Sequence, residues 1–598
     1  MHFAEWPSTR AARWFRALTL SALVVVATPS EAVQNAIVGT GTAASCTNAS
    51  WQAAWNIPAD ATQDLLITFN CGTIPLTISV NAPTEGLVRN YPTITVDGGT
   101  PGLITLSAAS GRILDFPGGR NLTVKNLTFI YGVGSASNCT TQDCDSGGAV
   151  RNLGSMTVIN CSFSGNAVSI AALSSATVGG GALFAGNGLT VINSTFSGNS
   201  ATGGAGGAIY FQAAGARIIN STFFNNVSQK VVSAGGSSKG GYGGAISGIG
   251  GLTVSGSHFA GNSADVDGGA VKTYGSLNAQ ATVVVANSSF FSNSALRAGG
   301  GLHSDVFTDS HVTNSTFSGN SAVSSAGGIA MYLGTVANSI VARNTPTNCS
   351  SAGGVTDGGG NLVLGDATCP GLNANPLLVA PTLAVPYFQL GTNSPAINTG
   401  LTGICAAAQG SPNFGAGGVD QLGRTRRIGT CDVGAYESQP VSLVATAGSV
   451  QNATINTPFR TVLQAKVLDA FNNPLNGTLV AFSGPPSGAG LMGGGNALSS
   501  LGGVAYFGAI ANGIAGTYTV AANAAGLPPA NFGLTNTVRL NPLLDVDDNG
   551  QVNLLTDGLL VVRYLLGLRG TALTTGGIGA NPGRTPEQIE TYIQSLLL

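Results

Sequence analysis

The sequence predicts an all-β protein whose largest part is a parallel β-helix solenoid, followed by a β-sandwich and a small helical tail. Two observations support this prediction. Gly makes up 88 of the 598 residues and charged residues only 8%, a composition typical of long β proteins with many tight turns. A motif of about thirty residues also recurs through the middle of the chain, and its segments alternate like strands, without a 3.6-residue helical period.

Each repeat contains two elements that alternate along the chain. The first is a short strand in which a Phe is followed three residues later by Asn. The second is a Gly-Gly pair followed by a small or aliphatic residue, as in Gly206-Gly207-Ala208. The Phe residues recur every 27–36 positions and are Phe163, Phe196, Phe223, Phe259, Phe290 and Phe317. Such a repeat predicts coils of three short strands, each rising by one strand spacing of ~4.8 Å.

The two elements also predict how neighbouring coils hold together. Each Phe should point inward and stack on the Phe of the next coil, which builds a continuous apolar core. Each Asn should hydrogen-bond to the Asn above and below it, as in other Asn ladders of stacked strands. The Asn residues are Asn166, Asn199, Asn226, Asn262, Asn293 and Asn320. The Gly-Gly corner permits positive φ and close backbone approach, and we expect length differences between repeats to lie in loops, as at 167–178 and 227–240.

The strand and turn pattern sets the expected limits of the solenoid. Strand-like segments with this rhythm begin near residue 93, so we place the β-helix at 91–345. Residues 33–90 would then form the N-terminal cap, which a solenoid needs over the open end of its core.

Residues 1–32 predict a secretory signal peptide. Three Arg residues between positions 10 and 16 precede the 12-residue apolar stretch 17–28, and 30–32 offers a small-x-small cleavage site. An apolar stretch of this length cannot span a ~30 Å hydrocarbon core, and no later stretch reaches the ~18–20 apolar residues that a span needs. We therefore expect an exported protein, secreted or at the bacterial cell surface, with no transmembrane segment.

The cysteines indicate the redox environment of the chain, and the net charge excludes one class of binding partner. An exported chain can oxidise its nine cysteines, and proximity suggests the pairs Cys46–Cys71, Cys139–Cys144, Cys349–Cys369 and Cys405–Cys431. Cys161, which is left over, sits in a repeat and is predicted to be a buried free thiol. A net charge of −2 excludes an electrostatic nucleic-acid binder, because that needs a basic face.

The repeats resemble those of polymorphic outer-membrane proteins and of related right-handed β-helix proteins on bacterial surfaces. Residues 346–438, which follow, are expected to hold the end of the solenoid and a module that resembles choice-of-anchor Q in Pro395-Ala396-Ile397, Asp420, Arg424 and Asp432 to Glu437. These resemblances imply a right-handed solenoid in a secreted or cell-surface protein. We expect the charged residues of this block, Asp420, Arg424, Asp432 and Glu437, to form a buried network of ion pairs and turns.

The C-terminal third changes character twice. Residues 439–539 resemble a bacterial Ig-like module of the invasin type through the turn at 469–474 and the strand at 516–520, and strands at this spacing suit a β-sandwich of ~100 residues. Residues 540–598 carry helix signals, including a Thr585 cap followed by Pro586 at the first helical position.

The tail also contains a predicted calcium site in the stretch DVDDNGQVNLLTDG, residues 545–558. The predicted ligands are Asp545, Asp547, Asn549, Gln551 through its backbone carbonyl, Asn553 directly or through water, and Asp557. Oxygen side chains at alternate positions, a Gly at the sixth position and a following helix are features of an EF-hand loop for Ca²⁺. The closing carboxylate comes one residue late, because Thr556 occupies the twelfth position. An ordinary Asp/Asn/Gly turn is the alternative interpretation.

The loop resembles those of dockerins, which implies calcium binding. Dockerins carry two such loops, however, and residues 571–598 contain no second one. We therefore do not expect docking to a cohesin.

Two classes of function fit this architecture. We expect a non-catalytic exported protein that binds a polysaccharide or a cell-surface protein through the lateral face of its β-helix. The alternative is a polysaccharide-degrading lyase or glycoside hydrolase, or an accessory protein of polysaccharide breakdown. Such an enzyme needs clustered carboxylates and a base, and the candidates that flank neighbouring Gly-Gly corners are Asp265, Asp267, His303 and Asp305. We interpret these as residues of solvated loops and assign no catalytic residue.

Overall fold

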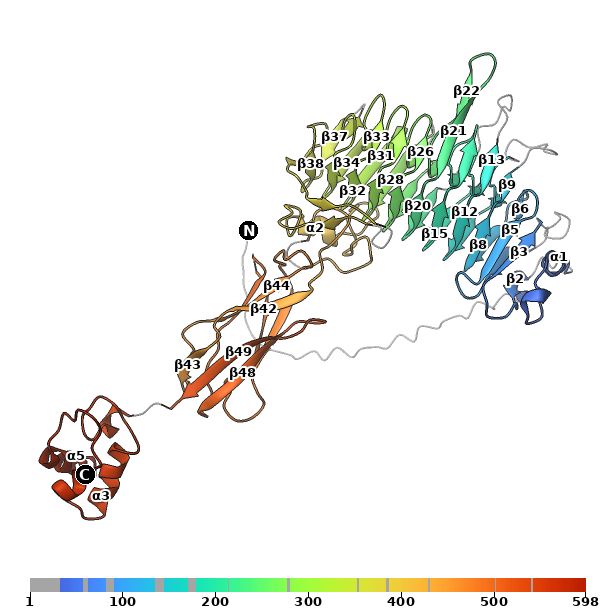
Figure 1. Ribbon diagram of the computed structural model, residues 1–598. Helices are drawn as coiled ribbons and strands as arrows, with labels where there is room; N and C mark the ends of the chain where they lie inside the picture. Colours follow the sequence, from blue (N-terminus) through green and yellow to red (C-terminus); the bar gives the residue numbers. More distant parts are fainter. Residues whose placement is uncertain are drawn as a thin grey trace, which may run out of the picture.

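The computed structural model describes residues 33–57, 63–81, 91–134, 145–169, 179–212, 215–276, 280–351, 354–382, 387–427, 431–500, 502–538 and 541–597. The predicted signal peptide, residues 1–32, lies outside this part of the chain. Figure 1 shows three parts in chain order: a long stack of strands, a smaller unit of strands and a compact helical tail. No helix of the described residues is long and apolar enough to cross a membrane.

The stack of strands is a parallel β-helix. In the described residues its strands form sheets of 19, 12 and eight strands. One coil contributes β11 (Met156–Ile159), β12 (Ser162–Ser164) and β13 (Ala167–Ser169) to the three sheets, and the next coil adds β15 (Leu189–Ile192), β16 (Thr195–Ser197) and β17 (Ser200–Thr202). Each strand pairs in parallel, residue for residue, with its counterpart. The expected all-β chain with a parallel solenoid is confirmed.

The predicted Phe stack runs through the core of the solenoid. It lies in the 12-stranded sheet, between β8 (Leu127–Ile130) and β32 (Thr316–Ser318). Ring centroids of neighbouring coils lie 4.3–4.8 Å apart, with planes within 4° of parallel. Phe129 extends the predicted stack by one ring, because β8 pairs with β12 in the same register. All of these rings are buried.

The predicted Asn ladder lies at the turn after each Phe strand. The amide nitrogen of Asn226, for example, donates to the side-chain oxygen of Asn262 at 2.9 Å and to the carbonyl of Phe196 at 3.0 Å. The same pattern extends from Asn166 to Asn348. Each Asn of the ladder thus provides hydrogen-bond partners for buried polar groups, which would cost free energy if they were left unpaired. The ladder is confirmed, and it continues beyond the last predicted Asn.

The Gly-Gly corners have the two properties that the sequence predicts. The first Gly of most corners adopts positive φ, as at Gly206 with φ 71°, although Gly300 and Gly327 do not. The second packs too closely for a side chain, because a Cβ on Gly207 would lie 2.0 Å from the carbonyl oxygen of Gly244.

One predicted loop is in fact a hairpin. Within 227–240, β21 (Val227–Val232) pairs antiparallel with β22 (Ser238–Gly240), and Figure 1 shows it projecting from the stack. The expectation of a loop there is wrong, because β21 continues the ladder of the eight-stranded sheet before it turns back. In 167–178, β13 occupies the first three residues, and 170–178 lie outside the described residues.

The N-terminal end of the solenoid holds a short helix, α1 (Asn48–Trp55), between β1 (Val33–Val38) and β2 (Asp64–Phe69). Its two buried tryptophans pack against core rings: Trp51 stacks on Phe69 at 6.1 Å, and Trp55 lies 6.0 Å from Phe116. The helix therefore places large apolar side chains against the first coils.

Three of the predicted disulfides are present: Cys46–Cys71, Cys349–Cys369 and Cys405–Cys431. Cys161 is buried and free, as predicted. The fourth predicted pair, Cys139–Cys144, lies outside the described residues.

The block at 391–438 contains α2 (Thr402–Ala406) and packs against the side of the β-helix. Arg426 joins the two, because its guanidinium donates to the side-chain oxygen of Asn287 at 3.0 Å and to Glu437 at 3.2 Å. Arg427 pairs with Asp432 at 3.1 Å. Asp420, Asp432 and Glu437 are buried in this network, as expected. Its cations, however, are Arg426 and Arg427, whereas Arg424 lies over the ring of Tyr436.

The smaller β unit consists of two sheets. Its three-stranded sheet contains β42 (Ser442–Ala447), β44 (Leu463–Leu468) and β47 (Val504–Phe507). Its five-stranded sheet follows the order β43 (Gln451–Thr454), β49 (Ala530–Thr537), β48 (Gly516–Asn523), β45 (Leu479–Ser483) and β46 (Gly495–Leu498). Leu463 and Phe482, one from each sheet, belong to one buried apolar cluster. The Ig-like assignment of this unit stays a prediction.

The tail is helical and has a small core of its own. Its helices are α3 (Asp557–Leu565), α4 (Thr571–Thr574) and α5 (Pro586–Leu596), after a short 3-10 turn η3 (Pro542–Leu544). Val546, Leu560, Leu573, Ile589 and Ile593 are buried together. As the sequence predicts, Thr585 caps α5: its hydroxyl accepts from the backbone N–H of Gln588.

Candidate functional site

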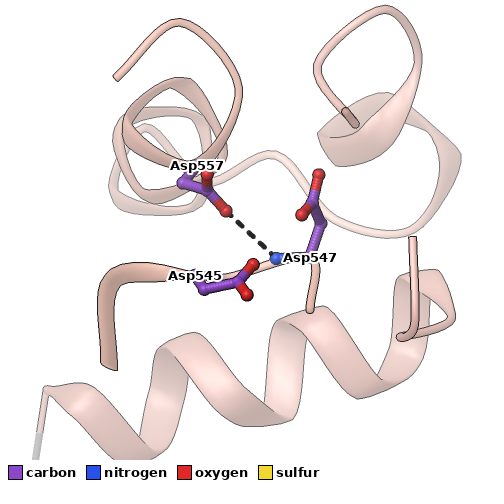
Figure 2. A group of neighbouring side chains, drawn as sticks. All are labelled: Asp545, Asp547 and Asp557. Atoms are coloured by element: carbon purple, nitrogen blue, oxygen red, sulfur yellow. Dashed lines mark hydrogen bonds between the residues drawn. The ribbon is translucent and has the colours of Figure 1, made fainter. Parts of the chain in front are cut away.

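The first candidate site is the acidic loop between η3 and α3. Asp545, Asp547 and Asp557 each offer a carboxylate oxygen within 4.8 Å of the others. Figure 2 shows these three side chains gathered beside the start of the helix. Asp547 and Asp557 are buried, while Asp545 is half-buried. The structure therefore brings together the three predicted carboxylate ligands.

Asp557 anchors the loop on the first turn of α3. One of its carboxylate oxygens accepts from the backbone N–H of Val546 at 2.6 Å and of Asp547 at 3.2 Å. The other accepts from the N–H of Asn553 at 2.8 Å. A carboxylate one residue after the twelfth position therefore still reaches the loop.

The remaining predicted ligands differ in how close they lie to the three carboxylates. The amide nitrogen of Asn549 donates to Asp547 at 3.2 Å, which places this side chain beside the cluster. The side-chain oxygen of Asn553 accepts from the N–H of Leu555 at 2.9 Å. Gln551 is exposed, and its N–H donates to the side-chain oxygen of Asn549. Asn549 and Asn553 thus shape the turn through their own side chains.

The electrostatics of the loop favour a bound cation. Burial raises the pKa of Asp547, and the nearby charges of Asp557 and Asp545 raise it further. In the described part of the chain, no Lys or Arg side chain forms an ion pair with any of these three carboxylates. Convergent carboxylate oxygens are the ligands that Ca²⁺ prefers. The residues present therefore fit a calcium ion.

Two residues far along the chain complete the loop, and sequence reasoning missed both. The N–H of Gly579 donates to the carboxylate of Asp547 at 2.6 Å. The guanidinium of Arg584 donates to the backbone carbonyls of Asp545 at 2.6 Å and Val546 at 3.0 Å. Arg584 also lies 3.6 Å from the Asp548 carboxylate. No spacing rule links these residues to the loop, because the packing of the tail brings them there.

The second candidate site is a cluster of charged side chains on the lateral face of the β-helix. Asp267 is fully buried and accepts two hydrogen bonds from Arg297. Nδ1 of His303 lies 3.4 Å from the same carboxylate oxygen that accepts from Nε of Arg297. Nζ of Lys272, also fully buried, donates to Asp305 at 2.6 Å and lies 3.8 Å from Asp267. The interpretation of Asp267, His303 and Asp305 as solvated loop residues is therefore wrong.

The register of the sheets explains this cluster. Lys272 on β27 (Val271–Tyr274) pairs with His303 on β31 (Leu302–Thr313), in the next coil. Burial alone would raise the pKa of Asp267, yet its contacts with Arg297 and His303 hold that pKa below the ordinary value. Burial lowers the pKa of Lys272, although its two carboxylate neighbours favour the charged amine. The cluster thus consists of two ion pairs on one face of the β-helix, and each pair has one fully buried partner, Asp267 or Lys272.

The remaining sequence candidate, Asp265, and two other histidines of the solenoid lie elsewhere. Asp265 accepts from the N–H of Lys230 at 3.1 Å, on the hairpin strand β21. His258 is buried, with Nδ1 2.7 Å from the hydroxyl of Ser289. His311 stacks on Phe414 with ring centroids 3.7 Å apart. None of the three belongs to the lateral cluster.

Residues 193–212 match the Chlamydia polymorphic membrane protein repeat. This segment holds one Phe strand and the following Gly-Gly corner, ending on β18 (Ile209–Phe211). The middle of the chain is a parallel β-helix, and one segment of it is similar to the polymorphic membrane protein repeat.

Among solved structures, the chain is similar to the PL6 family alginate lyase AlyGC, with 12% sequence identity and a TM-score of 0.24. The match covers 71% of this chain and 61% of the lyase, so it spans less than two thirds of that enzyme's length. Comparison with curated proteins finds no match.

Proposed function

We propose that this chain is an exported, surface-associated protein that binds a polysaccharide or a cell-surface protein through the lateral face of its β-helix. The observation that carries this proposal is the segment 193–212, which is similar to the polymorphic membrane protein repeat and lies within a stack of parallel strands. A family of that name is associated with membranes. A solenoid also offers an extended and rigid face for binding.

Three features support a binding role. The Phe and Asn ladders fix the coils between Phe129 and Asn348 against one another, so their lateral face changes shape little when it meets a partner. The disulfides suit an oxidising location outside the cytoplasm. The Ig-like assignment of residues 439–539 would add a spacer or contact module after the solenoid.

A co-sedimentation experiment tests this function. The full chain from residue 33 is labelled with a fluorophore and mixed with intact bacterial cells, cellulose, chitin and xylan. We expect saturable sedimentation with at least one of these surfaces. Absence of binding to all of them would contradict the proposal.

The alternative function, an enzyme of polysaccharide breakdown, has one observation in its favour. His303 lines a lateral cleft, and its Nδ1 faces the buried Asp267 carboxylate, as in the pairs that orient a general base. Incubation of the full chain with pectin, alginate and xylan, followed by assays for reducing ends and unsaturated products, decides between the two. Turnover that is lost in His303→Gln but kept in His311→Gln would overturn the binding role in favour of catalysis.

We also propose that the acidic loop binds Ca²⁺ and that the ion orders the tail. Without a cation, the carboxylates of Asp545, Asp547 and Asp557 repel one another within 4.8 Å. The carboxylates and the backbone carbonyl of Gln551 would supply oxygen ligands, and Asn549 and Asn553 stand at the positions that complete such a loop.

Calorimetric titration of the full chain with Ca²⁺ tests this site. We expect one binding event, which Asp547→Asn abolishes or weakens at least about tenfold, because it removes a buried charged ligand. Asp548→Asn is the matched control, since Asp548 lies in the same turn but outside the carboxylate group. Equal affinity in the two variants, or no heat at millimolar Ca²⁺, would show that the loop is an ordinary turn.

A further inference from the structure

A cleft lies beside these ion pairs on the lateral face of the β-helix. It has a volume of about 450 Å³, within the usual range of small-molecule sites. Its lining includes His303 and Asp305 from β31, Ser325, Tyr332 from β34 (Ile329–Ala337), and Ser350. The cleft thus combines an imidazole, a carboxylate, two hydroxyls and an aromatic ring.

Two hydrogen bonds from the protein hold the carboxylate of Asp305 in place. One oxygen accepts from Nζ of Lys272 at 2.6 Å, and the other accepts from the N–H of Val306 at 2.8 Å. A carboxylate has about four lone-pair sites, and the Asp305 side chain is 33% exposed. It is therefore fixed in position and still able to accept hydrogen bonds from a molecule in the cleft.

The Lys272 ammonium that holds Asp305 is itself rigid. It is fully buried, lies 3.8 Å from the Asp267 carboxylate and sits over the ring of Tyr274 at 4.6 Å. Asp267 is in turn clamped by Arg297. A ligand that hydrogen-bonds to Asp305 would meet an already ordered acceptor, which reduces the entropic cost of binding.

Tyr332 and the two serines supply the other contacts that a sugar needs. Tyr332 is 43% exposed and offers an aromatic surface against which the C–H face of a pyranose can pack. The hydroxyl of Ser325 donates to that of Ser350 at 2.9 Å, so the pair presents neighbouring polar groups at the rim. Vicinal sugar hydroxyls match a fixed carboxylate together with such hydroxyls.

We propose that this cleft is a binding subsite for a neutral sugar unit of a polysaccharide. The inference rests on the proposed binding function and names the chemical class of its ligand. The charged residues around the cleft favour a neutral sugar over an acidic one. Among the described residues that line the cleft, none is Lys or Arg, and the nearby Lys272 and Arg297 already pair with carboxylates. An acidic sugar would bring its carboxylate against Asp305 without a free cation.

Calorimetric titration of the full chain tests the subsite. The probes are cellohexaose, xylohexaose and mannohexaose as neutral chains, with hexagalacturonate as the acidic comparator. We expect saturable binding of at least one neutral hexasaccharide and at least about tenfold weaker binding of hexagalacturonate.

Matched variants locate the binding. Tyr332→Ala and Asp305→Asn should each weaken the neutral sugar at least about tenfold. Asp305→Asn keeps an acceptor for Lys272, which protects the fold. Tyr506→Ala, at an exposed tyrosine on β47, and Asp309→Asn, farther along β31, are the controls and should bind like the parent chain.

Each other outcome overturns the inference. Preference for hexagalacturonate would show that the subsite is acidic-sugar specific, and unchanged affinity in both cleft variants would place the sugar elsewhere. If no hexasaccharide binds while the chain still sediments with cells, this inference fails and the proposed function stands. If the chain binds neither sugars nor cells, both fail.

Discussion

Phe223 illustrates how a single side chain supports the whole stack. Its ring is buried between Phe196 and Phe259, at centroid distances of 4.8 and 4.7 Å. The next residue, Phe224, is 39% exposed. We expect Phe223→Ala to destabilise the β-helix by ~3–5 kcal/mol, because it leaves a cavity inside the stack. Phe224→Ala should change stability by less than about 0.5 kcal/mol. Urea unfolding measures the free energy of unfolding of both variants. Equal losses in the two variants would show that the Phe ladder is not the main source of core stability.

His258 makes the contact with the 391–438 block sensitive to pH. Its ring lies against Ser289, and the side chain of Gln421 also donates to Ser289, at 2.9 Å. Burial lowers the pKa of His258 to about 4 from its ordinary 6.5. Because the unfolded chain binds the proton more readily, the stability from neutral His258 is complete above pH 6.5 and is lost as the pH falls toward 4.

The resulting expectation is a loss of ~3 kcal/mol between these pH values. His258→Gln should flatten this part of the profile, whereas His311→Gln should leave it unchanged. Thermal unfolding from pH 7 to pH 4 makes the comparison. Parallel profiles for the parent and His258→Gln would show that other groups cause the acid sensitivity.

At the scale of elements, the Gly-Gly corners decide how tightly the coils stack. A Cβ on Gly207 would lie 2.0 Å from the carbonyl oxygen of Gly244 and 2.6 Å from the nitrogen of Val227. Both neighbours are backbone atoms of the adjacent coil and cannot move apart without breaking the ladder. Gly207→Ala should therefore cost about 3 kcal/mol or more.

Gly235, in the turn of the β21–β22 hairpin, is the control because a Cβ there meets nothing within 4 Å. Gly235→Ala should change the urea midpoint little. If the two variants unfold alike, the corner tolerates a side chain and close packing does not set the coil spacing.

The ladders show what the sequence could predict about elements. In a solenoid with constant register, residues at equal positions in successive repeats must stack, so the contacts of Phe196 and Asn199 follow from spacing alone. The antiparallel return of β22 could not be predicted, because that segment has no counterpart in the other repeats.

The same reasoning explains the outcome for the candidate sites. Asp545, Asp547 and Asp557 belong to one short loop, so their convergence follows from local spacing. The lateral cluster needs Lys272 to meet Asp305 from the next coil, and their register depends on turns that the motif leaves open. Gly579 and Arg584 reach the acidic loop only through packing of the tail, which no spacing rule encodes.

At the scale of the whole molecule, polar contacts join neighbouring units of the chain. Arg426 links the 391–438 block to the β-helix through Asn287, and Asn473 links the two-sheet unit to this block by donating to the carbonyl of Gly391 at 3.2 Å. Breaking one side of a buried ion pair costs far more than the pair itself contributes. The block at 391–438 is therefore in polar contact with both the solenoid and the two-sheet unit.

The tail is built differently, since its buried residues form a separate apolar cluster. We therefore expect removal of Ca²⁺ to loosen the tail and leave the β-helix intact. Without the ion, repulsion among Asp545, Asp547 and Asp557 opposes the turn that starts α3. Hydrogen exchange of the full chain with EDTA or with millimolar Ca²⁺ measures this.

Peptides from residues 545–597 should exchange faster in EDTA, while peptides from 189–224 in the Phe stack should exchange equally in both. Asp547→Asn should make the tail exchange fast even with Ca²⁺, and Asp548→Asn should respond to the ion like the parent chain. Equal exchange of the tail in EDTA and in millimolar Ca²⁺ would show that the tail folds independently of calcium. Faster exchange of the Phe-stack peptides in EDTA would instead place a calcium-dependent element in the solenoid.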